Sequence, residues 1–358
     1  MYRLLRALLF LLPAEWAHHL GMVALELLGE APALGRWLRR RATRAAAEVD
    51  LSTTLAGVRF PNCVGLAAGL DKDASATGGL YALGFGAVEV GTVTPRPQPG
   101  NPAPQLFRLR SHKTLINRMG FNNRGTAEMA ARLRELHARP APLGINVGKN
   151  KDTPLERAVE DYLACVEALA EHADYVVINA SSPNTPGLRT LQEPETLARL
   201  LAAVKARLPA GKPLFLKIAP DLAPEAVDAI VDVALASGAD GLVATNTTVA
   251  RPFEHPLAHE AGGLSGPPVK AASTAVIRRA YARSGGRLPI IGVGGVRSAE
   301  DAWEKLRAGA SLVQVYTGLV YEGPGLVRDI LDGIAARMKA GGHASLAEIV
   351  GRDVEIAR

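Results

Sequence analysis

Eight short apolar segments recur along the chain, and this repeat constrains the fold more than any other feature. Most of them are continuous in apolar residues, as strands buried on both faces are. Alanine- and leucine-rich helical stretches separate most of them, for example residues 161–173, 193–208 and 224–238. The eight segments are CVGLAAG (63–69), AVEVGT (87–92), LGINVG (143–148), YVVINAS (175–181), LFLKIA (214–219), GLVATN (241–246), PIIGVGG (289–295) and LVQVYT (312–317).

Eight strand–helix units in one chain predict an α/β fold of the (β/α)8 TIM-barrel class. A doubly wound parallel sheet is the alternative, but no GxGxxG motif follows a strand and opens a helix. The repeat leaves residues at both ends of the chain. We therefore expect an N-terminal helical extension over residues 1–45, the barrel over 46–338, and a C-terminal tail over 339–358 that forms a surface helix.

The N-terminal residues have an amphipathic pattern. Residues 1–12 (MYRLLRALLFLL) begin basic and turn apolar, but Arg6 leaves an apolar run too short for a signal peptide or a membrane span. Five arginines follow within residues 33–44. Two interpretations are equally supported: helices that lie on an anionic membrane, or a helical pair packed on the barrel. In residues 14–30 the apolar stripe consists of Trp16, Leu20, Val23 and Leu27.

Charge and cysteine content narrow the class of protein. The formal net charge is +6 and the pI is about 9.4, which favours an anionic ligand, membrane or polyanion as partner. The two cysteines, Cys63 and Cys165, are too few and too far apart for an iron–sulfur or other metal site. We expect both to be reduced thiols and the protein to hold no metal.

Polar residues cluster where the predicted strands end, which in a barrel is the face that carries the site. Lys72 and Lys217 are costly to bury without an anionic partner, so we expect an anion beside them. Ser182 lies in SSPNTPG without a GxSxG elbow, and on its own is a capping or turn serine. Glycine-rich turns after the last two strands predict a phosphate site at Gly294, Gly295, Tyr316, Thr317 and Gly318. Amides that could read a heterocyclic ring are Asn117, Asn146, Asn179, Asn184 and Asn246.

A longer set of motifs closely resembles the dihydroorotate dehydrogenases, in matching order over residues 50–335. The serine in SSPNTPG and the helical extension resemble class 2, the quinone-dependent, membrane-associated form, since class 1 enzymes place a cysteine there. The motifs are AAGLDKD (67–73), EVGTVTPRPQPGN (89–101), INRMGFNN (116–123), GINVGKNKDTP (144–154), INASSPNTPGLRTLQ (178–192), KIAPDL (217–222), ATNTT (244–248), GGLSG (262–266) and IIGVGG (290–295).

The resemblance implies oxidation of dihydroorotate to orotate, in pyrimidine biosynthesis, by an enzyme that holds one FMN. Ser182 would take the proton from C5 while the C6 hydride passes to flavin N5, and a membrane quinone would then accept the electrons. We accordingly expect a monomer that binds no nucleic acid and lies peripherally, through its N-terminal helices, on the cytoplasmic face of the inner membrane.

The resemblance also implies the site residues. The quinone site would include His18, Arg108 and Tyr316, although a one-residue shift would exchange His18 for His19. Substrate would contact Lys72, Asn117, Arg118, Met119, Gly120, Phe121, Asn179, Asn184, Asn246 and Thr247. FMN would contact Ala68, Gly69, Leu70, Asp71, Lys72, Thr92, Asn146, Asn179, Lys217, Thr245, Gly266, Gly295, Tyr316 and Thr317.

Two alternatives remain at this point. Another FMN barrel, such as a tRNA dihydrouridine synthase, would use the basic surface for RNA, but no aromatic platform accompanies the arginines. A membrane-surface or nucleic-acid binding protein on a barrel scaffold would hold no flavin and would not need the polar residues at the strand ends.

Overall fold

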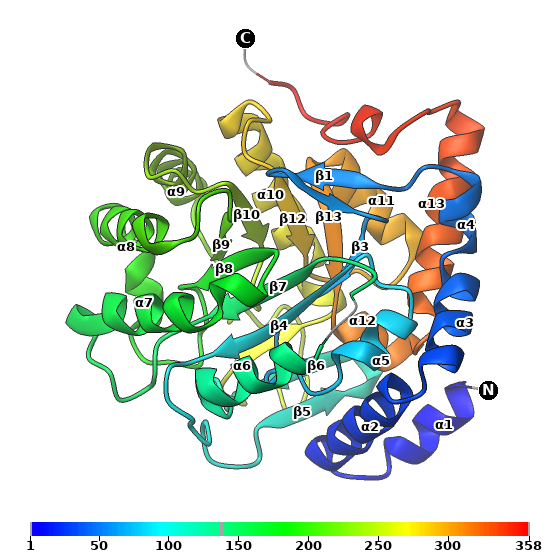
Figure 1. Cartoon of the computed structure of the whole chain (residues 1–358), viewed down its shortest axis with the longest axis horizontal. Coiled ribbons are helices and arrows are strands. Elements are labelled where there is room, and N and C mark those ends of the chain that lie inside the picture. The colour runs from blue at the N-terminus through cyan, green and yellow to red at the C-terminus, as the bar shows by residue number, and fades with distance from the viewer. Residues whose placement is uncertain (1, 137–138, 357–358) are drawn as a thin grey trace.

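The computed structural model describes residues 2–136 and 139–356, and its centre is a closed barrel of eight parallel strands (Figure 1). The strands follow one another around the barrel in chain order, which confirms the predicted (β/α)8 fold and all eight predicted strands. They are β3 (Val64–Leu66), β4 (Ala87–Val93), β7 (Leu143–Val147), β8 (Tyr175–Asn179), β9 (Leu214–Ile218), β10 (Gly241–Ala244), β12 (Ile290–Val293) and β13 (Ala310–Val315).

Helices surround the barrel, as expected for parallel strands joined by crossovers. Pro194, Pro224 and Ser298 mark three of the helix starts, since proline fits the first turn and serine caps it. The helices are α5 (Thr77–Ala82), α6 (Gly125–Glu135), α7 (Ala158–Leu169), α8 (Pro194–Arg207), α9 (Pro224–Ala236), α10 (Lys270–Ser284), α11 (Ala299–Arg307), α12 (Thr317–Glu322) and α13 (Leu326–Gly341). Short 3-10 turns occur at Arg110–His112, Leu155–Arg157, Ala170–His172, Leu188–Gln192, Pro267–Val269 and Leu346–Glu348.

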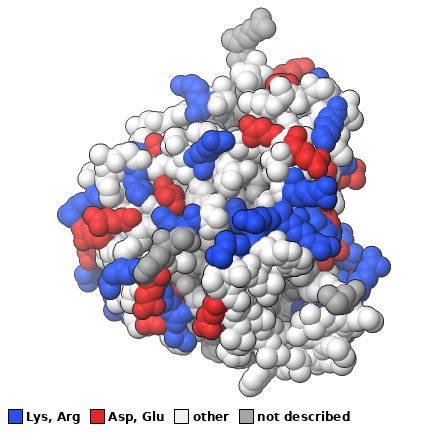
Figure 2. All heavy atoms as spheres, turned by 45° about the vertical axis from the view of Figure 1, so that its right-hand side comes forward, with Lys and Arg blue, Asp and Glu red and all other residues white. Residues whose placement is uncertain are grey.

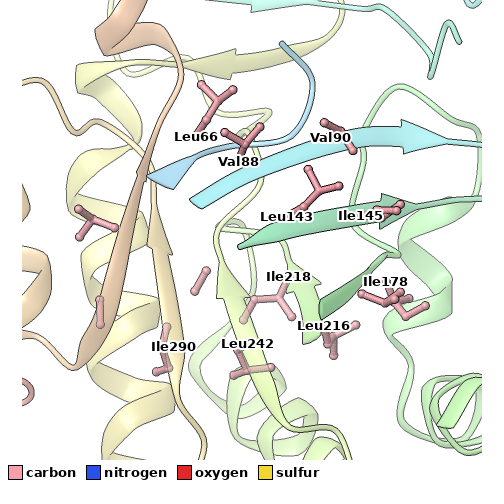
Figure 3. Close-up of a cluster of buried hydrophobic side chains, with 14 of the residues drawn as sticks. Leu66, Val88, Val90, Leu143, Ile145, Ile178, Leu216, Ile218, Leu242 and Ile290 are labelled. Atoms are coloured by element: carbon pink, nitrogen blue, oxygen red, sulfur yellow. The ribbon is translucent and has the colours of Figure 1, made fainter. Parts of the chain in front are cut away.

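Alternate residues of each strand face two different environments. Side chains such as Val90 and Ile145 pack in the large buried cluster between the barrel and its helices (Figure 3). Their neighbours face the barrel interior, where Tyr175 and Phe215 fill the end at which the strands begin. Further along the same inward positions the residues become polar. The interior is therefore apolar at the amino end of the strands and polar at their carboxyl end.

Two small antiparallel sheets that the sequence did not predict complete the barrel. A hairpin of β1 (Thr53–Leu55) and β2 (Val58–Phe60) places two apolar side chains in the interior cluster and so closes the amino end. A three-stranded sheet joins β5 (Leu106–Leu109) and β6 (Thr114–Asn117) to β11 (Gly263–Ser265), which come from two separate connections of the barrel.

The N-terminal helices form a layer along one side of the barrel (Figure 1). The predicted pair appears as α1 (Tyr2–Leu9) and α2 (Ala14–Gly29), followed by α3 (Pro32–Ala42) and α4 (Arg44–Glu48). Helix α2 packs closely on α5, and glycine at position 79 permits this approach. A Cβ atom added to Gly79 would lie only 2.0 Å from the Leu25 carbonyl oxygen. The apolar stripe of α2 nevertheless faces outward, so features of both sequence interpretations occur in the same helices. Among the described helices, none has the length and apolar character needed to cross a membrane.

The prediction that the C-terminal tail forms a surface helix is wrong for residues 342–356. Gly342 ends α13 in the left-handed conformation, with φ of 66°. Beyond it the chain forms a single 3-10 turn whose Leu346 and Ile349 are buried. The Arg307–Asp353 ion pair attaches this segment to α11. Packing of two apolar side chains thus replaces the regular helix.

Candidate active site

A cavity opens at the carboxyl end of the barrel. It collects residues from seven of the eight strands or the turns after them, together with β6, β11 and the loop after β8. The predicted site residues that line it are Ala68, Gly69, Lys72, Thr92, Asn117, Met119, Gly120, Phe121, Asn179, Ser182, Asn184, Lys217, Thr245, Asn246, Thr247, Gly266, Gly295, Tyr316 and Thr317.

Two lysines supply the positive charge of the cavity. Burial lowers the pKa of Lys72 to about 8, against the opposing effect of the Asp73 and Asp71 carboxylates. Burial also lowers the pKa of Lys217, and the charge of Glu89 works in the opposite direction. An anionic group bound beside either lysine would favour the protonated form, so both are suited to hold an anion.

Ser182 lies in the wall of the cavity and is 5% exposed. The backbone N–H of Asn184 donates a hydrogen bond of 3.2 Å to its Oγ. Such a donor stabilises negative charge that develops on the oxygen. The surrounding loop also brings in Asn184, whose Nδ2 donates to Asn117 Oδ1 at 3.0 Å. The serine is therefore fixed beside amides from another part of the chain.

The turns after β12 and β13 form a cradle lined by backbone. Gly295 has φ of 75°, and a Cβ atom there would lie 2.5 Å from Lys270 Cβ at the start of α10. Only glycine permits this approach. Thr317, the first residue of α12, shares a hydrogen bond of 2.7 Å with Ser265 Oγ. Glycine backbone and hydroxyl groups of this kind are suited to a phosphate.

The structure does not bring four other predicted residues to the cavity surface. Asn146 is fully buried behind it, bonded to Thr92 and Glu89. Arg118 turns away and pairs with Glu260 at 2.7 Å. The Asp71 carboxylate accepts hydrogen bonds from two backbone N–H groups, and Leu70 packs in the core. A motif specifies which residues are adjacent in the chain, but strand alternation decides which of them face the cavity.

Of the residues predicted for a quinone, Arg108 and Tyr316 lie against the N-terminal segment, and His18 lies on α2 itself. Tyr316 both lines the cavity and contacts an apolar cluster formed by Leu9, Phe10, Leu106, Leu115, Val320 and Tyr321. Arg108 donates to the Leu9 carbonyl at 3.2 Å and lies 4.7 Å above the Phe10 ring. His18 is half-buried and His19 is exposed, so the structure places His18 toward the barrel. Burial, followed by the charges of Lys72 and His19, lowers the pKa of His18 to about 4.

Sequence reasoning missed several lining residues. Ser265 lies in a quoted motif, but its role depends on the unpredicted pairing of β11 with β6. Gln314 lies within the predicted eighth strand, where its inward direction follows only from the alternation along that strand. Glu89 is the acid beneath the cavity, and a carboxylate within an apolar strand was the signal that could have revealed it. The remaining lining residues are Ala67, Val269, Val293, Gly294, Val296, Val315 and Gly318, of which the two glycines were expected at the phosphate.

No group of three or more His, Cys, Asp or Glu residues suited to a metal ion occurs within residues 2–136 and 139–356. Cys63 and Cys165 are free and buried.

Comparison with known proteins places this geometry in one family. The family model described as dihydroorotate dehydrogenase matches residues 50–338. The chain is 63% identical to "Dihydroorotate dehydrogenase (quinone)" of Myxococcus xanthus, over 99% of this chain and 98% of that protein. It is 54% identical to the protein of the same name from Anaeromyxobacter dehalogenans, over 98% and 96% of the two chains. The crystal structure of DHODH in complex with ferulenol from Eimeria tenella superimposes with a TM-score of 0.81 at 41% identity, covering 85% of this chain and 88% of that one.

Proposed function

This chain belongs to the dihydroorotate dehydrogenase family, and from that premise we propose which of its residues oxidise dihydroorotate to orotate with a quinone as electron acceptor. The family match does not support a tRNA dihydrouridine synthase. Membership in an enzyme family also argues against a barrel that only binds membranes or nucleic acid. The observation that carries the assignment of residues is the convergence of Ser182, two lysines and several amides on one cavity.

A flavin accompanies this family, and we infer that it is FMN. The supporting observations are the glycine cradle at Gly295, which suits a single phosphate, and the buried Lys217. The buried Gln314 Oε1 has no hydrogen-bond partner among the described residues, although its side chain lines the cavity. FMN, when bound, supplies the acceptor for a hydride and the donor for a quinone. Lys217 would then stabilise negative charge on the isoalloxazine ring, and the cradle would hold the phosphate.

Ser182 is the base in this proposal, and the amides and Lys72 hold the substrate. Lys72 would pair with the carboxylate of dihydroorotate, while Asn117, Asn184 and Asn246 read the polar edge of its ring. Ser182 Oγ would take the C5 proton and release its own hydroxyl proton to a water relay, while the hydride leaves C6. The Asn184 N–H favours the charge that develops on Ser182. Leu70, Asp71, Arg118 and Asn146 do not line the cavity and make no direct contact with the ligands in this proposal.

We further propose that the quinone enters beneath α1 and α2, where Arg108 and Tyr316 contact the apolar cluster and His18 is half-buried on α2. The outer face of these helices exposes apolar side chains, including Leu4, Leu11 and Trp16, whose exposed fractions are 75%, 77% and 64%. Figure 2 shows a largely uncharged surface bordered by a band of lysine and arginine. Arg40, Arg41 and Arg44 lie beside Trp37 at such a border. This surface suits peripheral binding to an anionic membrane.

The decisive experiment is anaerobic stopped-flow absorbance with two successive mixings. Dihydroorotate should bleach the flavin band, and a ubiquinone analogue should restore it. A flavin that dihydroorotate does not bleach would overturn the substrate assignment, while bleaching without recovery would overturn the acceptor. We propose that the protein is monomeric and lies on the cytoplasmic face of the inner membrane; light scattering and fractionation of cells with protease protection test these two points.

A further inference from the structure

Glu89 is a carboxylate enclosed within the barrel that has no direct contact with substrate in the proposed function. It points inward from β4, is fully buried, and does not line the cavity. Its oxygens accept hydrogen bonds from Asn146 Nδ2 at 2.8 Å and Gln314 Nε2 at 2.7 Å. Among the described residues Glu89 forms no salt bridge. Its charge nevertheless favours a higher pKa for Lys217 on β9 and for Tyr175 on β8. Burying a carboxylate costs free energy unless hydrogen-bond donors surround it, and hydrogen bonds to a carboxylate are stronger than those between neutral groups. Glu89 therefore constrains the orientation of the two amides that donate to it.

The carboxylate determines the direction of the amide next to it. An ionised carboxylate can only accept, so Asn146 must turn its NH2 group toward Glu89 and its Oδ1 the other way. That Oδ1 accepts the hydroxyl hydrogen of Thr92 at 2.5 Å. Thr92 Oγ1 has then used its only hydrogen and can only accept.

The same logic continues into the cavity. Thr92 Oγ1 accepts from Asn179 Nδ2 at 2.9 Å, which turns Asn179 Oδ1 toward Asn246. Asn246 Nδ2 donates to that oxygen at 3.2 Å and to Ser181 Oγ at 3.0 Å. The Asn246 Oδ1 accepts from the backbone N–H of Thr247 at 2.8 Å. A chain of hydrogen bonds therefore links Glu89 to the cavity wall, with one consistent direction throughout.

The two groups that end this series of hydrogen bonds each have one fixed role: the Glu89 carboxylate only accepts, and the Thr247 N–H only donates. Both ends therefore require the same orientation of every amide between them. Turning Asn146 over would place its Oδ1 against the Glu89 oxygen, so that two acceptors face each other. The reversed chain is excluded for that reason.

We propose that Glu89 is a positioning residue that fixes, through Asn146 and Thr92, which polar atoms the cavity presents to the dihydroorotate ring. The inference rests on the proposed function, because Asn246 is a substrate ligand there. Glu89 is thus a determinant of ring recognition that acts from beneath the site and touches neither the substrate nor its reacting atoms.

The test is an exchange of partners that restores the direction of the chain. In the E89Q/N146D double variant, the new amide at position 89 donates to the new carboxylate at position 146, which still accepts from Thr92. The amide oxygen at position 89 remains an acceptor for Gln314. In E89L, the partner of Asn146 is removed and its amide is free to turn. The matched control is D161N, which changes another buried carboxylate, on α7, that accepts from the Asn150 N–H outside the cavity.

Orotate affinity of the flavin-loaded oxidised proteins is measured by calorimetry, together with flavin content and the split between KM and kcat. We expect E89L, in its flavin-loaded form, to bind orotate about tenfold more weakly, as for the loss of one buried hydrogen bond, and to have a raised KM for dihydroorotate. The double variant and D161N should stay within about threefold of the original protein, less than the loss of one such bond.

Two results would overturn the proposal: wild-type affinity in E89L, or a flavin-loaded double variant that binds orotate as weakly as E89L. If E89L does not fold, the double variant alone decides, because both of its side chains keep the original shape. Failure of the proposed function is a separate outcome, since the unaltered protein would then neither bind orotate nor have its flavin bleached by dihydroorotate.

Discussion

The contact between α2 and α5 allows the quinone step to be separated from the dihydroorotate step with one methyl group. Replacing Gly79 by alanine would place a Cβ atom 2.0 Å from the Leu25 carbonyl oxygen and 2.7 Å from the Leu25 carbonyl carbon. Ordinary contact requires roughly 3.4 Å, so the backbones must separate by more than an ångström. Both elements are helical backbone and cannot yield as a flexible side chain would.

Overpacking of this kind costs about 1–3 kcal/mol, and the improved helix propensity of α5 does not offset this cost, because α5 is helical whether or not α2 is docked. A cost of about 2 kcal/mol shifts the docking equilibrium of α2 by about 30-fold. The cavity residues lie on the barrel and should keep their geometry. We therefore expect Gly79→Ala to slow flavin reoxidation by a quinone analogue while dihydroorotate still reduces the flavin at close to the original rate.

Gly21→Ala is the matched control, because it lies on the same helix as Leu25 and its added Cβ would meet nothing within 4 Å. Anaerobic stopped-flow absorbance measures both half-reactions for the two variants. Equal quinone rates in Gly79→Ala and Gly21→Ala would refute the reasoning, and so would an equal loss of both half-reactions in Gly79→Ala.

Three further predictions concern the cavity. Ser182→Ala should slow flavin reduction by dihydroorotate by about 10²–10⁴-fold while flavin stays bound, and unchanged stopped-flow reduction would exclude Ser182 as the base. Lys217→Ala should release flavin more readily or lower the potential of the bound flavin, measured by ultrafiltration and by redox titration; no change in either would show that Lys217 does not serve the flavin. The pKa of Lys72 is about 8, and its cationic form holds an anion, so orotate affinity should fall as pH rises above that value. Calorimetry from pH 6 to 10 checks this, with a flat profile counting against Lys72.

The sequence predicted the barrel and much of the cavity because both follow from local pattern. Buried parallel strands are continuous in apolar residues, and the residues after them meet at one end of the barrel. Lys72 and Lys217 could therefore be placed at the same end of the barrel although they are far apart in the chain, whereas the pocket role of Asn117 came from the family resemblance. Asn146 was placed too close to the cavity surface, because motifs do not show how deep an inward-facing residue lies.

Other features depend on pairing between distant segments. The β5–β6–β11 sheet requires residues near 115 and 264 to meet, and neither segment is long enough to reveal itself as a strand. The C-terminal tail is not the surface helix that we expect from the sequence, because Gly342 ends α13 and the segment beyond it buries Leu346 and Ile349. Glu89 lies within a family motif, but the sequence does not reveal its role, because that role depends on the order of hydrogen bonds above it.

The three-stranded sheet has a consequence for the range of molecules that the enzyme accepts. Asn117 on β6 is paired with Gly263 on β11, and its Nδ2 also donates to the Gly263 carbonyl at 3.3 Å. Ladder hydrogen bonds thus hold this wall of the cavity in place, and the Asn184–Asn117 hydrogen bond of 3.0 Å joins the Ser182 loop to it. Ring analogues enlarged toward Asn117 should therefore be rejected. Inhibitors of this enzyme have to keep their ring compact on the side that faces Asn117.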